Sequence, residues 1–154
     1  MSAPRYRDIA GNELPSVSAN DVTLIAIAGA WSVGEESLQG PLHELSPIAQ
    51  MADLQLAPDA EYVCDVPATA NTMAFAFEGS LQANVQDLRS PGLAVFEAGN
   101  SLVIRASKEG ARCLLLTGEP IGEPVVQYGP FVMNTREEVE TALNEYRLGT
   151  FLKH

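Results

Sequence analysis

The chain of 154 residues has few of the side chains that most often carry catalysis or metal binding. It contains two histidines, two cysteines, and nine lysines and arginines against twenty aspartates and glutamates. The formal net charge of −11 repels phosphate backbones, and the basic residues form no stripe, so we expect no direct nucleic-acid binding. Solubility is a sufficient explanation for the acidic balance.

Long apolar runs and a secretory leader are also missing. No apolar run approaches the roughly 18 residues that a membrane-spanning helix needs. The first residues, MSAPRYRDIAGNELP, lack the apolar core of a signal peptide. We therefore expect no membrane span and a cytoplasmic protein. Cys64 and Cys113, both in apolar strand-like contexts, are then expected as buried free thiols, although spacing alone leaves a disulfide open.

The sequence does contain many short apolar segments separated by turns. Hydrophobic residues make up 46% of the chain and charged residues 19%, which is typical of a single globular domain at this length. The segment VTLIAIAG (22–29) predicts a buried strand, and Leu54 and Leu56 alternate as in a half-buried strand. Strands then recur about every 8–12 residues, which predicts a sandwich or barrel of about eight strands.

The remaining segments are interpreted as connections and turns. Residues 1–20 are polar and predict a lead-in segment, and AWSVGEESLQGPLHELSP (30–47) predicts a long loop. Within residues 71–88, Glu78-Gly79-Ser80 predicts the turn of a hairpin. Gly99-Asn100 predicts the turn between two later strands.

The C-terminal segment predicts one well-capped helix. Thr135 and Glu138 have the spacing of a capping box, Asn134 is a competing N-cap, and Gly149 is placed to end the helix. Gly129-Pro130 predicts a hinge before it. We expect the helix to pack on the sheet through one apolar stripe, with partner binding as the alternative. The stripe consists of Val139, Ala142, Leu143 and Tyr146.

The string EPVVQYGPFVMNT (123–135), within the longer run 114–151, resembles the C-terminal signature of the pirin family. Three earlier segments resemble the second jelly roll of pirins in outline: IAGAWSVG, LQLAPDAEYVCDVPATANTMAFAFEGSL and LAVFEAGNSLVIRA. The resemblance implies an all-β cupin-type jelly-roll barrel, or double-stranded β-helix, with one C-terminal α-helix. We place the jelly roll at residues 21–128, and the hinge and helix, packed on the barrel, at 129–154.

The same resemblance implies an activity that we do not expect this chain to carry alone. Pirins are similar to bicupins, in which the first jelly roll holds an iron through three histidines and one glutamate and is associated with quercetinase activity. Nuclear members of the family act as transcription cofactors through protein contacts. This chain resembles only the second jelly roll, which lacks that metal.

A cupin metal motif can be aligned with the sequence, but its ligand positions hold other residue types. With Gly79 as the last glycine of the first motif, the glutamate position falls on Thr72. The histidine position of the second motif falls near Gly110. The two histidine positions of the first motif fall on Val66 and Ala68, or on Asp65 and Pro67.

Other ligand or nucleophile sets are equally sparse. His43 has Glu44 beside it in a predicted loop, but two ligands from one loop do not close a site, and His154 is the terminal residue. Cys113 has Arg112 as its neighbour, and adjacent strand residues point to opposite faces. We therefore predict no metal, no cofactor and no catalytic residue, and no enzyme activity unless a separate metal-bearing cupin is present.

The motif register divides residues 71–77 between the two sides of the barrel. Thr72, Ala74 and Ala76 are predicted to face the lumen, where they either leave a cavity for a small apolar ligand or are covered by larger side chains. The outward side chains must be covered by the C-terminal segment, by a second subunit, or by both. The predicted interface residues are Trp31, Met73, Phe75, Phe77, Phe131 and Met133.

Three functions follow from these observations. The favoured one is a metal-free pirin-type C-terminal cupin that acts as a non-catalytic protein-interaction or regulatory module, as a homodimer. The second is an accessory half that pairs with a metal-bearing cupin on another chain and supports quercetinase-like oxygen chemistry there. The third is a barrel that binds a small apolar ligand. Resemblance in fold does not decide among them.

Overall fold

A computed structural model describes residues 6–43, 49–83 and 85–151 of the chain. They form two compact units, Met1–Pro120 and Ile121–His154. Each unit is described here by itself, so the packing of the C-terminal helix on the barrel stays a prediction. Glu44 and His154, which the sequence brought into consideration as metal ligands, lie outside the described residues.

The first unit is built of strands, preceded by a single 3-10 turn, η1 (Gly11–Glu13). The predicted lead-in segment is shorter than expected, because the first strand already begins at Ser16 and pairs with the second. The strands are β1 (Ser16–Ala19), β2 (Val22–Ala28), β3 (Ala30–Val33), β4 (Glu36–Gln39), β5 (Ala49–Leu56), β6 (Glu61–Asp65), β7 (Asn71–Ala83), β8 (Gln86–Arg89), β9 (Gly92–Phe96) and β10 (Ser101–Gly118).

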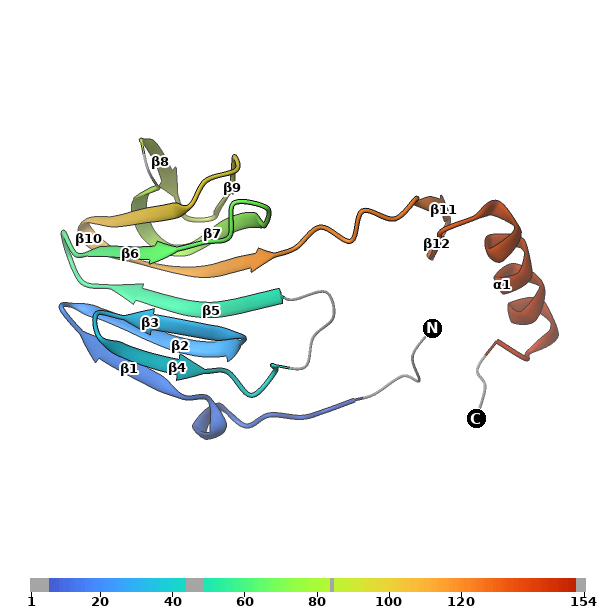
Figure 1. Ribbon diagram of the computed structural model, residues 1–154, viewed down its shortest axis with the longest axis horizontal. Helices are drawn as coiled ribbons and strands as arrows, with labels where there is room; N and C mark the ends of the chain where they lie inside the picture. The colour runs from blue at the N-terminus through green and yellow to red at the C-terminus, as the bar shows by residue number, and fades with distance from the viewer. Residues whose placement is uncertain (1–5, 44–48, 84, 152–154) are drawn as a thin grey trace. The chain divides into compact units, whose positions relative to one another are not determined.

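Within the described part of this unit, eight strands form one antiparallel sheet. Its order is β1-β2-β5-β10-β7-β8, with β6 also paired to β10 and β9 to β7. The long strand β10 joins the two halves, because residues 101–105 pair with β6, residues 111–118 pair with β5, and β7 lies along its other edge. Figure 1 shows these strands following one another from β1 to β8 and β9. The all-β jelly roll predicted from the sequence is confirmed.

The hydrophobic core lies on the inner side of this sheet, because apolar residues alternate along each strand. In β2 every second residue is buried, from Val22 to Ala28, which confirms the predicted buried strand. Leu54 and Leu56 of β5 are buried in the same way, as their alternation predicted. The predicted free thiols are also confirmed, since Cys64 and Cys113 are both buried and unpaired.

The loop predicted at residues 30–47 is wrong in its first part. Ala30–Val33 and Glu36–Gln39 form the antiparallel hairpin β3–β4, with Gly34 in the turn at a φ of +60°. Trp31 and Val33 face the core, and the Trp31 indole Nε1 donates to the Ala28 carbonyl at 2.9 Å. The glycines and polar residues suggested a loop, but they occupy the turn and the exposed positions of a hairpin.

The hairpin turn predicted at Glu78-Gly79-Ser80 is also wrong. Strand β7 runs unbroken from Asn71 to Ala83, and the chain turns only before β8. Gly79 instead lies at an irregularity of the β7–β10 ladder, at a φ of +66°, where a Cβ would collide with the Gly110 carbonyl. Glycine is needed here for a β-bulge, which requires a positive φ just as many turns do. The turn predicted at Gly99-Asn100 is confirmed, since it separates β9 from β10.

The second unit contains a small hairpin and one helix. The hairpin joins β11 (Val126–Tyr128) to β12 (Phe131–Met133), and the predicted hinge Gly129-Pro130 forms its two-residue turn. Helix α1 spans Arg136–Leu148. Among the described residues, no helix has the length and apolar character needed to cross a membrane.

The predicted caps of helix α1 are confirmed. Thr135 is the N-cap: its Oγ1 accepts from the Glu138 amide at 3.2 Å, and Glu138 Oε2 accepts from the Thr135 amide at 2.9 Å. Gly149 is the C-cap in the left-handed conformation. Val139 and Ala142 of the predicted stripe are buried, whereas Tyr146 packs edge-on against Phe131 with ring centroids 5.9 Å apart.

Candidate functional site

The outer side of the sheet carries an apolar surface that spans five neighbouring strands, which we call the outer face. Its central residues are the large side chains of β7, and the register of the ladders places other apolar residues beside them. Met73 lies opposite Val95 and Leu116, and Phe75 lies opposite Leu93 and Leu114. The outer face consists of Ile25, Ile27, Met51, Met73, Phe75, Phe77, Leu93, Val95, Leu114 and Leu116.

None of these side chains is fully buried within the described chain. Phe75 is 37% exposed, Leu93 56% and Val95 67%, and the others are half-buried among one another. Four spacings between five strands give the outer face a width of about 19 Å, by the usual distance of about 4.8 Å between strands. Contiguous apolar surface of that width is uncommon on monomers and marks interaction sites.

The ion pair between Asp53 and Arg112 lies on the same side of the sheet. Arg112 donates from Nε and Nη2 to the two carboxylate oxygens of Asp53, at 2.9 and 2.6 Å, and its guanidinium lies 5.3 Å from the centre of the Phe77 ring. The hydrogen bond to Asp53 raises the pKa of Arg112 further, which keeps it charged. Glu78 Oε1 is 3.7 Å from Arg112 Nη1, beyond hydrogen-bond distance. Arg112 therefore keeps donor capacity at the border of the outer face.

The predicted lumen residues do lie on the inner side of the sheet. Ala74 and Ala76 have no exposed surface and belong to the same core cluster as the larger side chains of Leu54 and Leu115. The Thr72 hydroxyl donates to Thr117 Oγ1 at 3.2 Å, so the two buried hydroxyls satisfy each other. The register predicted for residues 72–77 is thus confirmed, and a ligand in the lumen stays a prediction.

The predicted interface residues fall into three groups. Met73, Phe75 and Phe77 lie on the outer face, as expected. Trp31 does not fit an interface, because it is 7% exposed and packs in the core of its own unit. Phe131 and Met133 are half-buried in the second unit, where Phe131 packs edge-on against Tyr146 and Phe151.

The cupin metal positions do not fit a metal ion. Thr72 occupies the glutamate position, and its hydroxyl already has a partner in Thr117. Gly110, near the second histidine position, supplies no side chain at all. In the described ranges, no group of three or more histidine, cysteine, aspartate or glutamate residues is arranged to hold an ion. A facial set of nitrogen and oxygen ligands, which iron or manganese requires, is therefore not formed by these residues.

The buried thiols are poor nucleophiles in this environment. Burial raises the pKa of Cys113 to about 12 and that of Cys64 to about 11, although a hydrogen bond with Tyr62 lowers the Cys64 value. Burial also raises the pKa of the Tyr62 hydroxyl, which donates to the Ser32 carbonyl at 3.0 Å. These groups are neutral at physiological pH, and a protonated thiol attacks slowly.

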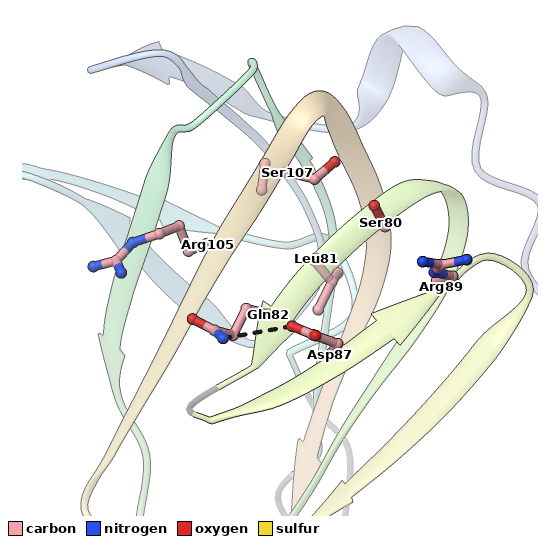
Figure 2. Close-up of a pocket in the computed structure, with 8 residues that line it drawn as sticks. Ser80, Leu81, Gln82, Asp87, Arg89, Arg105 and Ser107 are labelled. Atoms are coloured by element: carbon pink, nitrogen blue, oxygen red, sulfur yellow. Dashed lines mark hydrogen bonds between the residues drawn. The ribbon is translucent and has the colours of Figure 1, made fainter.

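An open polar depression of about 310 Å³ lies between β7, β8 and β10. Figure 2 shows Arg89 and Arg105 on opposite sides of it, with the Gln82–Asp87 hydrogen bond between them. Arg105 is already paired with Glu61. The polar groups therefore do not converge on one point, as they would around a bound ligand.

The antiparallel jelly roll defines the chain's first unit as a cupin-type domain. The model of the pirin C-terminal cupin domain matches residues 51–152, so the chain belongs to that family. The resemblance found in the sequence is thereby confirmed.

Individual relatives agree with this assignment. The chain is 34% identical over 158 residues to Pirin-like protein 2 of Arabidopsis thaliana, covering 97% of this chain and 48% of the relative. It is 32% identical over 153 residues to a pirin-like protein of Solanum lycopersicum, covering 97% and 51%. A crystal structure of quercetin 2,3-dioxygenase from Acinetobacter baumannii superposes with a TM-score of 0.83 at 28% identity, covering 96% of this chain and 50% of that one.

The chain spans about half the length of the curated relatives it matches. Sequence reasoning had missed much of the outer face, namely the residues of β9 and β10 that flank Met73 and Phe75 and those of β2 and β5 beyond them. It had also missed the Asp53–Arg112 pair. The alternation of Leu93 and Val95 was a usable signal for one side of β9, but only the strand register brings these residues together.

Proposed function

We propose that this chain is a non-catalytic pirin-type C-terminal cupin that works by protein contact through its outer face. The observation that carries the proposal is the set of large apolar side chains on β7, β9 and β10 that the strands of the first unit leave partly uncovered. Covering such a surface removes apolar area from water, at roughly 25 cal/mol per Å². A protein partner is the occupant that fits a wide, shallow sheet face.

The charges around the outer face favour a specific partner over indiscriminate association. The Asp53–Arg112 pair neutralises itself, so the face carries little of the chain's net charge of −11. A partner that covers Arg112 must offer an acceptor to its remaining N–H groups, because a buried unsatisfied guanidinium is costly. The partner surface therefore combines apolar side chains with a carbonyl or carboxylate group.

The residue types in the core and at the cupin metal positions support a non-catalytic role. Thr72 replaces the carboxylate ligand, its hydroxyl bonds to Thr117, and the buried thiols are protonated. An acid, a base or a nucleophile with an adjusted pKa is what an enzyme site requires. The pKa values of Cys64 and Cys113 are raised, which keeps both thiols protonated, so neither meets this requirement.

A second role is favoured by the relatives rather than by the site. The superposed Acinetobacter baumannii protein is named as a quercetin 2,3-dioxygenase, and this chain covers half of it. In this role the outer face would take a metal-bearing cupin of another chain, and the oxygen chemistry would take place there. This is one form of the same contact function.

The proposal is tested by assaying quercetin consumption with the purified chain after incubation with ferrous iron, manganese or nickel. The Acinetobacter baumannii enzyme serves as the positive control. We expect no turnover above the buffer rate, because the residues at the cupin positions cannot hold the ion. Turnover by the chain alone would overturn the proposal, whereas turnover only after addition of a metal-bearing cupin would support the accessory role.

A further inference from the structure

Strand β9 is an edge strand that lacks the features proteins use to prevent edge pairing. Among the described strands it pairs with β7 alone, so its other edge presents backbone groups without a strand partner. Its sequence, Gly92–Phe96, contains no charge and no proline within the strand. Natural edges are usually protected by lysines, prolines, bulges or a covering segment, and an unprotected apolar edge pairs readily with another chain.

The side chains of β9 are complementary to a second copy of the same strand. If two copies pair antiparallel around a two-fold axis at Ala94, Leu93 of each copy lies opposite Val95 of the other. These are the two exposed side chains of the strand, 56% and 67%. Apolar cross-strand pairs of this kind stabilise antiparallel strand pairing. The arrangement is isologous, as a closed dimer requires.

The charges that flank β9 fit the same register. Arg89 ends β8, which precedes β9 along the same edge of β7, and Glu97 follows β9 directly. Both are exposed, and neither forms an ion pair with another described residue. Figure 2 shows Arg89 at the rim of the depression, on the side opposite Arg105. Antiparallel pairing at Ala94 brings Glu97 of each copy toward Arg89 of the other, twice per dimer.

We propose that two copies of the chain form a symmetric dimer by antiparallel pairing of their β9 edges, centred on Ala94. The proposal rests on the protein-contact function stated above and names a second copy as one partner. Pairing joins the two sheets through main-chain hydrogen bonds, which is the mode of β-strand addition. It also places the two outer faces side by side, so each dimer offers a larger apolar surface to a further partner.

The first test is the mass of the full chain in solution, by light scattering over a range of concentrations. We expect twice the chain mass of 16.5 kDa for the natural sequence. Val95→Lys places two like charges in the paired edge and is expected to give the monomer mass. Val85→Lys is the matched control, because Val85 is 94% exposed between β7 and β8, and it should leave the dimer intact. A monomer at every concentration overturns the proposal.

The second test is the register, by oxidation of two cysteine variants. Leu93→Cys and Val95→Cys chains should cross-link when mixed and much less when each is alone, because residue 93 lies opposite residue 95 of the partner. Cross-linking of Leu93→Cys alone would mean a different register and would overturn the pairing at Ala94. The native thiols do not interfere, since Cys64 and Cys113 are buried.

A charge exchange gives a third, independent readout. Arg89→Glu should raise the dissociation constant of the dimer about two- to thirtyfold, the range that the loss of two rim ion pairs per dimer supports. The double variant Arg89→Glu and Glu97→Arg should restore the original constant. If the double variant is as weak as the single one, the two residues do not meet, and the proposed register is wrong. If all three tests fail, the expected result of the quercetin assay does not change. The dimer can therefore be disproved while the proposed non-catalytic function stands.

Discussion

Phe75 of β7 and Leu93 of β9 lie directly opposite each other on the outer face of the sheet, and both remain well exposed. On the inner side of the same two strands, Ala74 and Ala94 lie opposite each other and are buried. The strand pair thus places its small side chains inside and its large ones outside. This is the reverse of what the stability of a lone jelly roll would select, and it is the basis of the contact function that we propose.

Phe75→Lys separates contact from stability. Because Phe75 lies on the outer face, we expect the free energy of unfolding to fall by less than about 1 kcal/mol, the size of a cross-strand pair. Removal of an apolar side chain from an exposed face should also raise solubility in ammonium sulfate. Urea unfolding and precipitation curves measure the two effects. A loss near 3 kcal/mol, as for a core phenylalanine, would show that the chain itself covers this residue.

Ala76→Leu tests whether the interior is filled. Ala76 is fully buried and lies opposite Cys113 and Gly92, so added methyl groups have to displace neighbours. We expect a loss of about 1–3 kcal/mol in the free energy of unfolding, as overpacking causes. Ala98→Leu, in the exposed turn after β9, is the control and should change little. Unchanged or increased stability of Ala76→Leu would indicate space for a ligand and favour the third function.

The buried thiols predict a loss of stability at alkaline pH. In the unfolded chain a thiol ionises near its ordinary pKa of 9.0, but in the folded chain Cys113 ionises near 12 and Cys64 near 11. Above pH 9 the unfolded chain therefore binds fewer protons than the folded one, and the free energy of unfolding falls as the pH rises. Each thiol contributes up to about 1.4 kcal/mol per pH unit in that window.

Urea unfolding between pH 7 and pH 10.5 measures this effect. Cys113→Val should reduce the steepness with which the free energy of unfolding falls above pH 9. Below pH 8 the substitution should not change how that free energy depends on pH. A slope identical to that of the natural chain would mean that Cys113 ionises in the folded protein at its ordinary pKa. Rapid reaction of the native chain with a thiol reagent at pH 8 would contradict the burial of both thiols.

Thr135→Ala tests the cap of helix α1. The substitution removes the Oγ1 acceptor of the Glu138 amide, and loss of such an N-cap costs about 1 kcal/mol. We expect faster hydrogen exchange of amides in Arg136–Leu148. Thr141→Ala is the matched control, because Thr141 donates to the Glu137 carbonyl inside the helix and is not a cap. Equal exchange in both variants would show that the cap does not stabilise the helix.

Local signals in the sequence were sufficient for the helix and for the alternating strands. The capping box, the terminal glycine and the apolar spacing of α1 all lie within one segment. The helix could therefore be predicted without knowledge of any distant contact. The alternation of Leu54 and Leu56 identified β5 for the same reason. Where neighbouring residues contain the whole requirement, sequence and structure agree.

The errors arose where two structures share one local requirement. Gly79 needs a positive φ, but a bulge opposite Gly110 satisfies that need as well as a turn does. Gly34 lies in a hairpin turn, but the polar residues around it led to the prediction of a loop. The outer face depends on the register of five strands, and cross-strand neighbours such as Phe75 and Leu93 are not determined by either segment alone.

The most direct test of the central claim, that this chain is a contact module and not a metal-dependent enzyme, is elemental analysis of the purified full chain. The protein would be incubated with ferrous iron, manganese, nickel and zinc in turn, and unbound ions removed before measurement. The account predicts no stoichiometric metal, because Thr72 and Gly110 stand where ligands are required. One bound ion per chain, with quercetin turnover that depends on it, would contradict the account.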